Sequence, residues 1–203
     1  MEIIKLLTGP LEINTYVLIN NDKALVIDPG GDQQKIIALA QQKNARIEKV
    51  LLTHGHFDHI GAVKALKEGG AAVYIGASDA EMLTSNSKNL GKYFGMGVET
   101  CSADVLLLGG EEILLGDKKI TAIATPGHSL GGMCYLTDDG IFTGDTLFCL
   151  SIGRTDFPGG SLSQLVNSIK TKLFVLDDKT RVFPGHDAET TIENEKNFNP
   201  FLR

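Results

Sequence analysis

The chain carries the sequence Thr53-His54-Gly55-His56-Phe57-Asp58-His59, an H-x-H-x-D-H cluster that holds three of its five histidines. Imidazole and carboxylate groups are the ligands that zinc and iron accept in proteins. A group of purely structural histidines would not account for carboxylates placed in register with them. The cluster therefore predicts a metal site.

The segments on either side define the place of this cluster in the fold. Lys49–Thr53 is a short apolar strand pattern, and His59–Lys67 has the period of an amphipathic helix. The cluster therefore lies on a strand-to-helix loop. Its first two histidines are two residues apart and point to the same side of an extended backbone. The adjacent aspartate and histidine at its end point in different directions, so one loop can serve two neighbouring ions.

Three further candidate ligands follow the same pattern, because each comes just past the end of a predicted strand. They are His128 after the strand at 120–124, Asp145 after the strand at 141–143, and His186 after the strand at 181–183. Strand ends are where a rigid sheet presents functional loops. The sequence therefore predicts that four strand ends deliver seven ligands to one place.

The order of these motifs resembles the metallo-β-lactamase superfamily, and within it the glyoxalase II-like (hydroxyacylglutathione hydrolase-like) branch, in a short single-domain subgroup. The resemblance covers nearly the whole chain and rests on the HxHxDH motif with its downstream ligands. It extends to Asn14-Thr15-Tyr16, Val26-Ile27-Asp28-Pro29-Gly30, Gly144-Asp145-Thr146-Leu147-Phe148 and the stretch from Ser151 to Gly160.

This resemblance implies a centre for two divalent metal ions, for which zinc is favoured and iron or manganese is also suitable. The implied ligands of the first ion are His54, His56 and His128. Those of the second ion are Asp58, His59 and His186. Asp145 is implied to bridge the two ions.

The implied fold is of the α+β class, an αββα sandwich in which two mixed β-sheets face each other and helices flank them. Strand patterns that alternate with helical patterns at Asp32–Lys43, Ile60–Lys67 and Leu162–Leu173 support it independently. A single domain over residues 1–203 is expected. Only 17 residues follow His186, so the helical C-terminal domain that supplies much of the glutathione site in full-length glyoxalase II enzymes is not expected here.

Composition restricts the partners and the location. The net charge of −6 argues against a nucleic acid as partner, and the three cysteines at wide spacings do not suggest a disulfide framework. Neither a signal peptide nor an apolar run that could span a membrane is evident. A cytoplasmic protein is the simplest expectation, and the sequence leaves its oligomeric state open.

The resemblance implies hydrolysis of a small anionic thioester of the hydroxyacylglutathione type by a metal-bridging hydroxide. Asp58 is the candidate catalytic residue, which orients the nucleophile or passes a proton to the leaving group. Arg154 and Tyr93 are candidate substrate-binding residues. Arg154 suits a substrate carboxylate, but a salt bridge with Asp156 explains it equally well. Tyr93 and its neighbour Phe94, in the Gly-rich stretch Asn89–Gly97, could line the pocket or pack on the core of their own loop, and Tyr93 is taken as the candidate.

Two other residues near the motifs favour a structural interpretation. Asp28 lies in an Asp-Pro-Gly turn, where its carboxylate can hydrogen-bond the backbone, so we do not expect it to be an eighth ligand. Cys149 follows Asp145 closely, yet a small buried residue is the favoured interpretation, ahead of a nucleophile.

Alternative functions remain open at this point. Persulfide dioxygenases share the scaffold and a stretch similar to Gly153–Phe157, and hold one iron with residues that match His54, His128 and Asp145. A non-catalytic metal-binding module is disfavoured because no ligand position has been lost. Class B β-lactamases fit less well, since they do not combine this bridging aspartate with the aspartate–histidine pair that ends the cluster.

Overall fold

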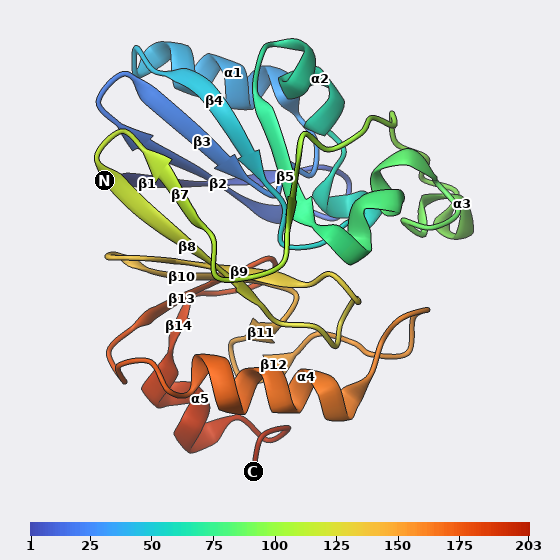
Figure 1. The fold of residues 1–203 in the computed structure, drawn as a ribbon, viewed down its shortest axis with the longest axis vertical. Helices are drawn as coiled ribbons and strands as arrows, with labels where there is room; N and C mark the ends of the chain where they lie inside the picture. Colours follow the sequence, from blue (N-terminus) through green and yellow to red (C-terminus); the bar gives the residue numbers. More distant parts are fainter.

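The computed structural model describes residues 1–203 and has four layers, helix, sheet, sheet and helix (Figure 1). The first sheet is built from residues 2–107, in the order β1-β2-β3-β4-β5-β6. Its first three strands pair antiparallel, and β3 to β6 pair parallel. These strands are β1 (Glu2–Thr8), β2 (Ile13–Asn20), β3 (Lys23–Ile27), β4 (Arg46–Leu51), β5 (Ala72–Gly76) and β6 (Val105–Leu107).

The second sheet follows in the sequence, in the order β14-β13-β10-β9-β8-β7. All of its pairs are antiparallel except β10 with β13, which are parallel. Both sheets are therefore mixed, as expected. The strands are β7 (Glu112–Leu115), β8 (Lys118–Ala124), β9 (Met133–Thr137), β10 (Gly140–Gly144), β13 (Arg181–Pro184) and β14 (Thr190–Thr191), with a small hairpin of β11 (Leu147–Phe148) and β12 (Ser151–Ile152) between β10 and β13.

Helices cover the outer face of each sheet (Figure 1). The first sheet is covered by α1 (Gln33–Gln42) and α2 (Val63–Glu68), and the second by α4 (Leu162–Ser168) and α5 (Ile192–Phe198). The Ser161 hydroxyl accepts a hydrogen bond from the Gln164 amide at 3.4 Å at the start of α4. Such N-caps satisfy a backbone donor that the first turn of a helix leaves free. None of the helices has the length and hydropathy that a membrane span needs.

Strand β2 shows how the sheets are held. Its side chains alternate between the two faces, so Tyr16 and Leu18 pack against the second sheet, and Val17 and Ile19 pack beneath the helices. All four are buried. A strand with both faces covered needs apolar side chains at consecutive positions, which explains the unbroken apolar runs at residues 16–19 of β2 and 24–27 of β3. The aromatic rings of Tyr16, Phe142 and Phe183 join the sheets, with centroids 4.7–5.6 Å apart.

The expected αββα sandwich with two mixed sheets is confirmed, and one element differs from the expectation. The predicted helix from His59 or Ile60 to Lys67 begins only at Val63, and Phe57–His59 forms a separate 3-10 turn. The reason is contact with the turn after β3. A Cβ atom on Gly61 would lie 2.2 Å from the Gly30 carbonyl oxygen, and the Ala62 amide donates to the Pro29 carbonyl. Helix α2 can therefore begin only after the residues that contact this turn.

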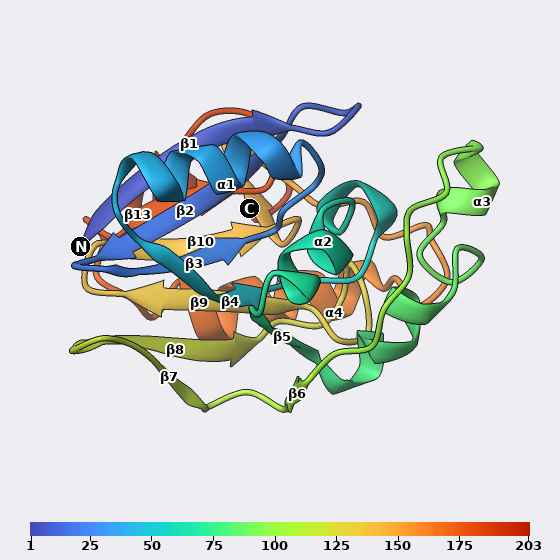
Figure 2. The ribbon, with the colours of Figure 1, turned by 90° about the horizontal axis from the view of Figure 1, so that it is seen from above.

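The candidate ligands lie at one end of the two sheets. Strands β8 and β10 run toward the end of the molecule at which the short helix α3 (Gly91–Phe94) projects (Figure 2). The loops after β4, β8, β10 and β13 emerge there together. The fold therefore places the four predicted ligand segments side by side.

Candidate metal centre

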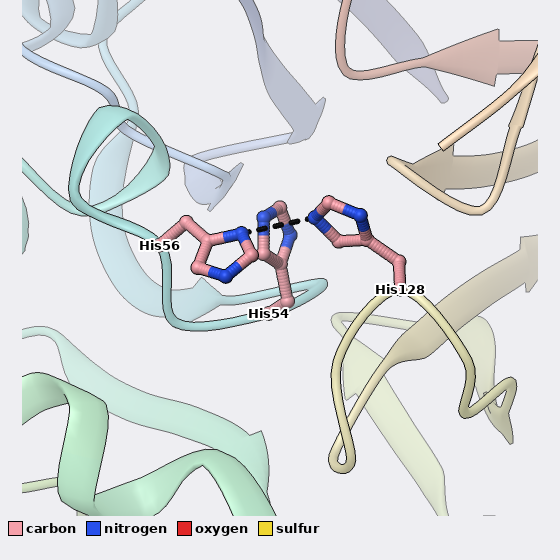
Figure 3. Close-up of side chains that lie close together, drawn as sticks. All are labelled: His54, His56 and His128. Atoms are coloured by element: carbon pink, nitrogen blue, oxygen red, sulfur yellow. Dashed lines mark hydrogen bonds between the residues drawn. The ribbon is translucent and has the colours of Figure 1, made fainter. Parts of the chain in front are cut away.

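The first ligand set consists of His54, His56 and His128, whose ligand atoms all lie within 4.8 Å of one another. The ring centroids of the three pairs are 4.6–4.7 Å apart. The Nδ1 atom of His56 and the Nε2 atom of His128 are 2.9 Å apart, and the rings point toward one another from facing loops (Figure 3). All three side chains are buried. The structure thus brings together the residues expected for one ion.

The second set consists of Asp58, His59 and His186, again with ligand atoms within 4.8 Å of one another. The Oδ2 atom of Asp58 lies 3.4 Å from Nε2 of His186 and 3.6 Å from Nε2 of His59. His59 is fully buried, whereas the His186 side chain is 27% exposed. The adjacent pair at positions 58 and 59 thus lies with His186, and a third group within the same distance, Asp28, His54 and His59, joins the two sets.

Asp145 lies between the two sets, and its two oxygens face different sets. Oδ1 is 3.3 Å from Nε2 of His59 and 3.8 Å from Nε2 of His186. Oδ2 is 3.7 Å from Nε2 of His128. One carboxylate thus faces both groups of ligands.

The polar atoms of these side chains test whether the site fits a metal. Three buried atoms, one from each part of the centre, have no hydrogen-bond partner. They are Nε2 of His54, Nε2 of His59 and Oδ1 of Asp145. Buried polar atoms are normally paired, because leaving one unpaired is costly. Nitrogen and carboxylate lone pairs that converge in this way fit a divalent cation.

The surroundings of His54 and His56 keep these two rings neutral. Burial, followed by the neighbouring histidines His59, His56 and His128, holds the pKa of His54 well below its usual value. Burial and the His128 ring lower the pKa of His56 to about 3. Both rings therefore lack the extra proton at neutral pH. A neutral imidazole is the form that binds a metal.

The second set concentrates negative charge. Burial alone would lower the pKa of His59, but the carboxylates of Asp145, Asp58 and Asp28 raise it well above the usual value. Burial opposes ionisation of Asp145, yet His59, His128 and His54 hold the pKa of that carboxyl well below its usual range. These carboxylates thus stabilise positive charge at His59. A divalent cation satisfies the same requirement when it replaces the proton.

Asp28 orients two of the ligands. Its Oδ1 accepts the backbone amide of Thr53 at 2.8 Å, so the expected backbone hydrogen bond is confirmed. Its Oδ2 accepts the Thr53 hydroxyl at 2.6 Å and faces Nδ1 of His59 at 3.0 Å. The Thr53 oxygen in turn lies 3.1 Å from Nδ1 of His54. These bonds direct the Nε2 lone pairs of both rings to the centre, as partners of metal-bound histidines do.

This role of Asp28 was missed in the sequence, although a signal for it exists. Strands β3 and β4 are parallel neighbours, so their carboxyl ends meet. A carboxylate just after one and a histidine cluster just after the other are therefore neighbours. From the sequence alone, Asp28 is expected only to stabilise the Asp-Pro-Gly turn by a hydrogen bond to the backbone.

Asp79 supports the opposite side of the centre and was also missed. It is 1% exposed, and its oxygens accept the Gly131 amide at 2.7 Å and the Ser129 hydroxyl at 2.6 Å. Burial raises the pKa of this carboxyl. Ser129 follows His128 directly, so Asp79 holds the loop that presents this ligand. Nothing in the residues around Asp79 marks it, because the contact spans 50 positions.

A cavity of about 290 Å³ opens over the centre. His56, His128, Asp58, Asp145 and His186 form its polar part. The remaining walls are apolar apart from Arg154. These apolar residues are Leu11, Phe57, Leu90, Phe94, Met96 and Phe157.

The two candidate substrate-binding residues differ in position. Arg154 lines the cavity, donates to both oxygens of Asp156 at 2.7 Å, and lies with its guanidinium carbon 3.9 Å from the centroid of the Phe157 ring. The position of Arg154 therefore agrees with both interpretations, as a side chain that could bind a substrate carboxylate and as the partner of Asp156 in a salt bridge. Tyr93 is 80% exposed and is not part of the lining, whereas the adjacent Phe94 is. The structure does not bring Tyr93 to the cavity.

Cys149 lies between β11 and β12, and its side chain is half-buried. It is not part of the cavity lining. The position agrees with the interpretation that Cys149 is not a nucleophile of this site, although the side chain is less buried than expected.

Comparison with protein families and with curated proteins gives matches over most of the chain. The family model described as Metallo-beta-lactamase superfamily matches residues 8–186. A protein of Bacillus subtilis named probable metallo-hydrolase YqgX is 39% identical over 198 residues, with 96% of this chain and 94% of the relative covered. Hydroxyacylglutathione hydrolase GloC of Haemophilus influenzae is 35% identical over 184 residues, with 88% and 87% covered.

Solved structures are similar over nearly the full length. The structure described as BLEG-1 B3 metallo-beta-lactamase has a TM-score of 0.94 at 36% identity, covering 99% of both chains. TTHA1623 in a di-iron-bound form has a TM-score of 0.88 at 34% identity, covering 98% of this chain and 100% of that one. ETHE1 from Myxococcus xanthus has 0.83 at 33%, covering 98% and 84%. The similarity to the structure described as a B3 metallo-beta-lactamase does not support the expectation that this chain resembles class B β-lactamases less closely than other branches of the superfamily.

Proposed function

Because the chain belongs to the metallo-β-lactamase superfamily, we propose that it is a metal-dependent hydrolase that cleaves a thioester of the hydroxyacylglutathione type. The observation that carries this proposal is the pair of complete ligand sets that share Asp145, one carboxylate oxygen facing each set. The identity to the hydroxyacylglutathione hydrolase GloC supports the thioester as substrate. The sequence-based resemblance to the superfamily is confirmed.

In this proposal His54, His56 and His128 hold one divalent ion, and Asp58, His59 and His186 hold the other, with Asp145 shared. When bound, two such ions lower the pKa of a shared water to near neutrality and polarise a carbonyl group. Zinc is the favoured metal because imidazole and carboxylate ligands suit it. Iron suits the same ligands, and the similar TTHA1623 has been solved with two irons.

Asp58 is proposed as the catalytic residue because it lies at the cavity wall with the ligands. Burial opposes its ionisation, but His59 and His186 hold the pKa of this carboxyl below its usual value. It is therefore charged at neutral pH and can accept a hydrogen bond from the attacking water. The proton that it takes can then pass to the departing thiolate, which leaves as a thiol when the acyl group becomes a carboxylic acid.

The apolar walls determine which part of a substrate the cavity holds. Phe57, Phe94 and Phe157 line the cavity together with the polar groups of the centre. A thioester sulfur is poorly hydrated, so it lies in such surroundings at little cost in desolvation. Arg154 is the one cationic group of the wall. We propose that it faces a carboxylate of an anionic thioester at the rim.

The assay that tests this proposal uses the metal-loaded protein with S-D-lactoylglutathione, a cephalosporin and glutathione persulfide as alternative substrates. The expected result is release of glutathione from the thioester, without oxygen consumption, and slower turnover of the other two. Preferred opening of the cephalosporin would overturn the thioester assignment and leave the hydrolase class standing.

A persulfide dioxygenase with a single iron is the second candidate, since the ETHE1 structure is 33% identical and the Gly153–Phe157 stretch resembles that class. Elemental analysis separates the two candidates. One iron per chain, together with oxygen uptake and sulfite formation from glutathione persulfide, would replace the hydrolase assignment. Two metal ions per chain and thioester cleavage would exclude the dioxygenase.

Arg154→Ala is expected to raise KM for an acidic thioester and to leave kcat nearly unchanged. A contact remote from the scissile bond acts equally on the ground and transition states. We expect a change of about fivefold or less, because the guanidinium is 55% exposed and already paired with Asp156.

The control for this experiment is Asp156→Asn, which removes the competing carboxylate and is expected to lower the same KM. A neutral ester analogue should respond to neither substitution. Equal losses on the acidic and neutral substrates would instead assign Arg154 a purely structural role.

A further inference from the structure

His186 differs from the other four histidines in how it is held. Their side chains are at most 5% exposed, whereas that of His186 is 27% exposed. The segment that carries it passes directly over the centre. A Cβ atom on Gly185 would lie 2.7 Å from both Oδ1 of Asp145 and Cε1 of His59. A small shift of this segment would therefore move His186 relative to the other ligands.

Other ligands are oriented through their second ring nitrogen. Nδ1 of His59 faces Asp28 at 3.0 Å, and Nδ1 of His128 donates to the Arg154 carbonyl at 2.8 Å. His186 is oriented instead by hydrogen bonds that the backbone makes on either side of it. The Gly185 amide donates to the Gly144 carbonyl at 2.9 Å, which fixes one side of the segment.

Asn14 fixes the other side. Its side-chain amide donates to the Pro184 carbonyl at 3.0 Å and to the Asp187 carbonyl at 2.9 Å. Its backbone amide donates to the Gly185 carbonyl at 2.8 Å. Asn14 is 1% exposed, so these bonds are sheltered from water. One asparagine on β2 thus holds the residues immediately before and after His186, about 170 positions away in the sequence.

The next two residues of β2 continue the same contacts. The Tyr16 hydroxyl donates to the Pro184 carbonyl at 2.8 Å. The Thr15 hydroxyl donates to the Asp28 carbonyl at 2.6 Å and accepts the Gly30 amide at 3.3 Å. Asp28 has a positive φ of 48°, a conformation that a non-glycine residue keeps only when its surroundings enforce it. The tripeptide at 14–16 therefore supports both the His186 segment and the turn that orients His59.

We propose that Asn14 is a positioning residue that places His186 and thereby sets the affinity for the second metal ion. The inference rests on the ligand sets of the proposed function, and it assigns a role to a motif that the reaction itself does not use. Asn14 reaches the ion only through the backbone of residues 184–187. Partners of metal ligands typically contribute about 10–100-fold to metal affinity.

The test is zinc titration of the full chain with competition by a chromogenic chelator. Asn14→Ala is expected to weaken binding of the second ion by about 10–100-fold and that of the first by less than about threefold. Excess zinc should restore two ions per chain, because the ligands themselves are intact. His186→Ala provides the reference, since in that variant excess zinc should restore the second ion far less well.

The matched control is Asn20→Ala at the other end of β2. Asn20 also donates its side-chain amide to a carbonyl of the second sheet, that of Leu115, at 2.7 Å, but it lies far from the ligands. It should lose stability like the Asn14 variant and keep both zinc affinities. If Asn14→Ala and Asn20→Ala bind the second ion equally well, the inference is wrong.

Tyr16→Phe covers the case in which Asn14→Ala does not fold. It removes one hydroxyl and leaves the ring in the core, so it is expected to weaken the second ion selectively and by less than Asn14→Ala. Unchanged affinity in this variant, with Asn14→Ala unfolded, would also overturn the inference. Zinc stoichiometry needs no substrate, so these outcomes stand apart from the thioester assay: a wild-type protein that binds two ions and cleaves no thioester would refute only the proposed function.

Discussion

Replacing Asp145 with alanine is expected to reduce occupancy of both metal sites together and to lower kcat/KM at least about 10³-fold, or about 4 kcal/mol. The reason is that Asp145 faces both sets, with Oδ1 near His59 and His186 and Oδ2 near His128. Asp28 also lies within 4.8 Å of one ligand of each set, His54 and His59, but its oxygens already accept the amide and hydroxyl of Thr53 and face Nδ1 of His59. Loss of any other ligand should affect mainly one ion. Elemental analysis after gel filtration, beside initial rates on S-D-lactoylglutathione, measures both quantities.

Asp139→Ala is the control for this substitution. Asp139 lies in the turn before β10, at the opposite end of the strand that Asp145 follows. Its replacement should leave metal content and rate unchanged. If Asp145→Ala retained both ions and full activity, the shared-ligand assignment would be wrong.

Removal of the metals is expected to abolish activity and to lower Tm by roughly 8–16 °C. A ligand present at about 1,000 times its Kd stabilises the folded state by about 4.1 kcal/mol. A chain of about 200 residues loses roughly 2–4 °C for each kcal/mol. The stabilisation is expected because binding pairs three buried atoms that otherwise lack partners, in His54, His59 and Asp145.

Calorimetry with and without a chelator measures the shift in Tm. Zinc, manganese or iron added back should restore both Tm and activity, and magnesium, which prefers oxygen ligands, should restore neither. Full activity in the presence of excess chelator would contradict the metal-dependent mechanism. An unchanged Tm with complete loss of activity would contradict the expected stabilisation and would mean that the ions bind too weakly to stabilise the folded state.

The sequence predicted which side chains lie together, because each candidate ligand follows the end of a strand. His128, Asp145 and His186 each follow an apolar segment that could only be a buried strand, and strand ends of one sheet meet at one edge. In the H-x-H-x-D-H cluster, residues two apart point to the same side and adjacent residues point in different directions, so one loop can serve two ions. The assignment of each ligand to an ion rests on the family resemblance.

The sequence did not reveal which groups support these ligands. The bonds from Asn14 to the His186 segment and from Asp79 to the His128 segment join residues 50 or more positions apart. No periodicity or local motif encodes such pairs. The start of α2 was predicted too early for a related reason, because the contact of Gly61 with Gly30 that delays the helix is tertiary. Of the neighbours Tyr93 and Phe94 the sequence favoured Tyr93, whereas Phe94 lines the cavity, because orientation within a single short turn cannot be read from composition.

The separation of the two sheets along the chain has a consequence for how the protein is made. Every strand of the first sheet lies before residue 108, and every strand of the second lies after residue 111. During synthesis every strand of the first sheet leaves the ribosome before any strand of the second, while the domain folds as a unit. Its inner face, with Tyr16, Leu18 and Leu25, stays uncovered until the second sheet has been translated.

The last ligand to leave the ribosome is His186, on the segment that Asn14 holds from the first hairpin. The nascent chain therefore exposes a broad apolar surface for most of its translation, and chaperone capture should be strongest for chains stalled between residues 112 and 183.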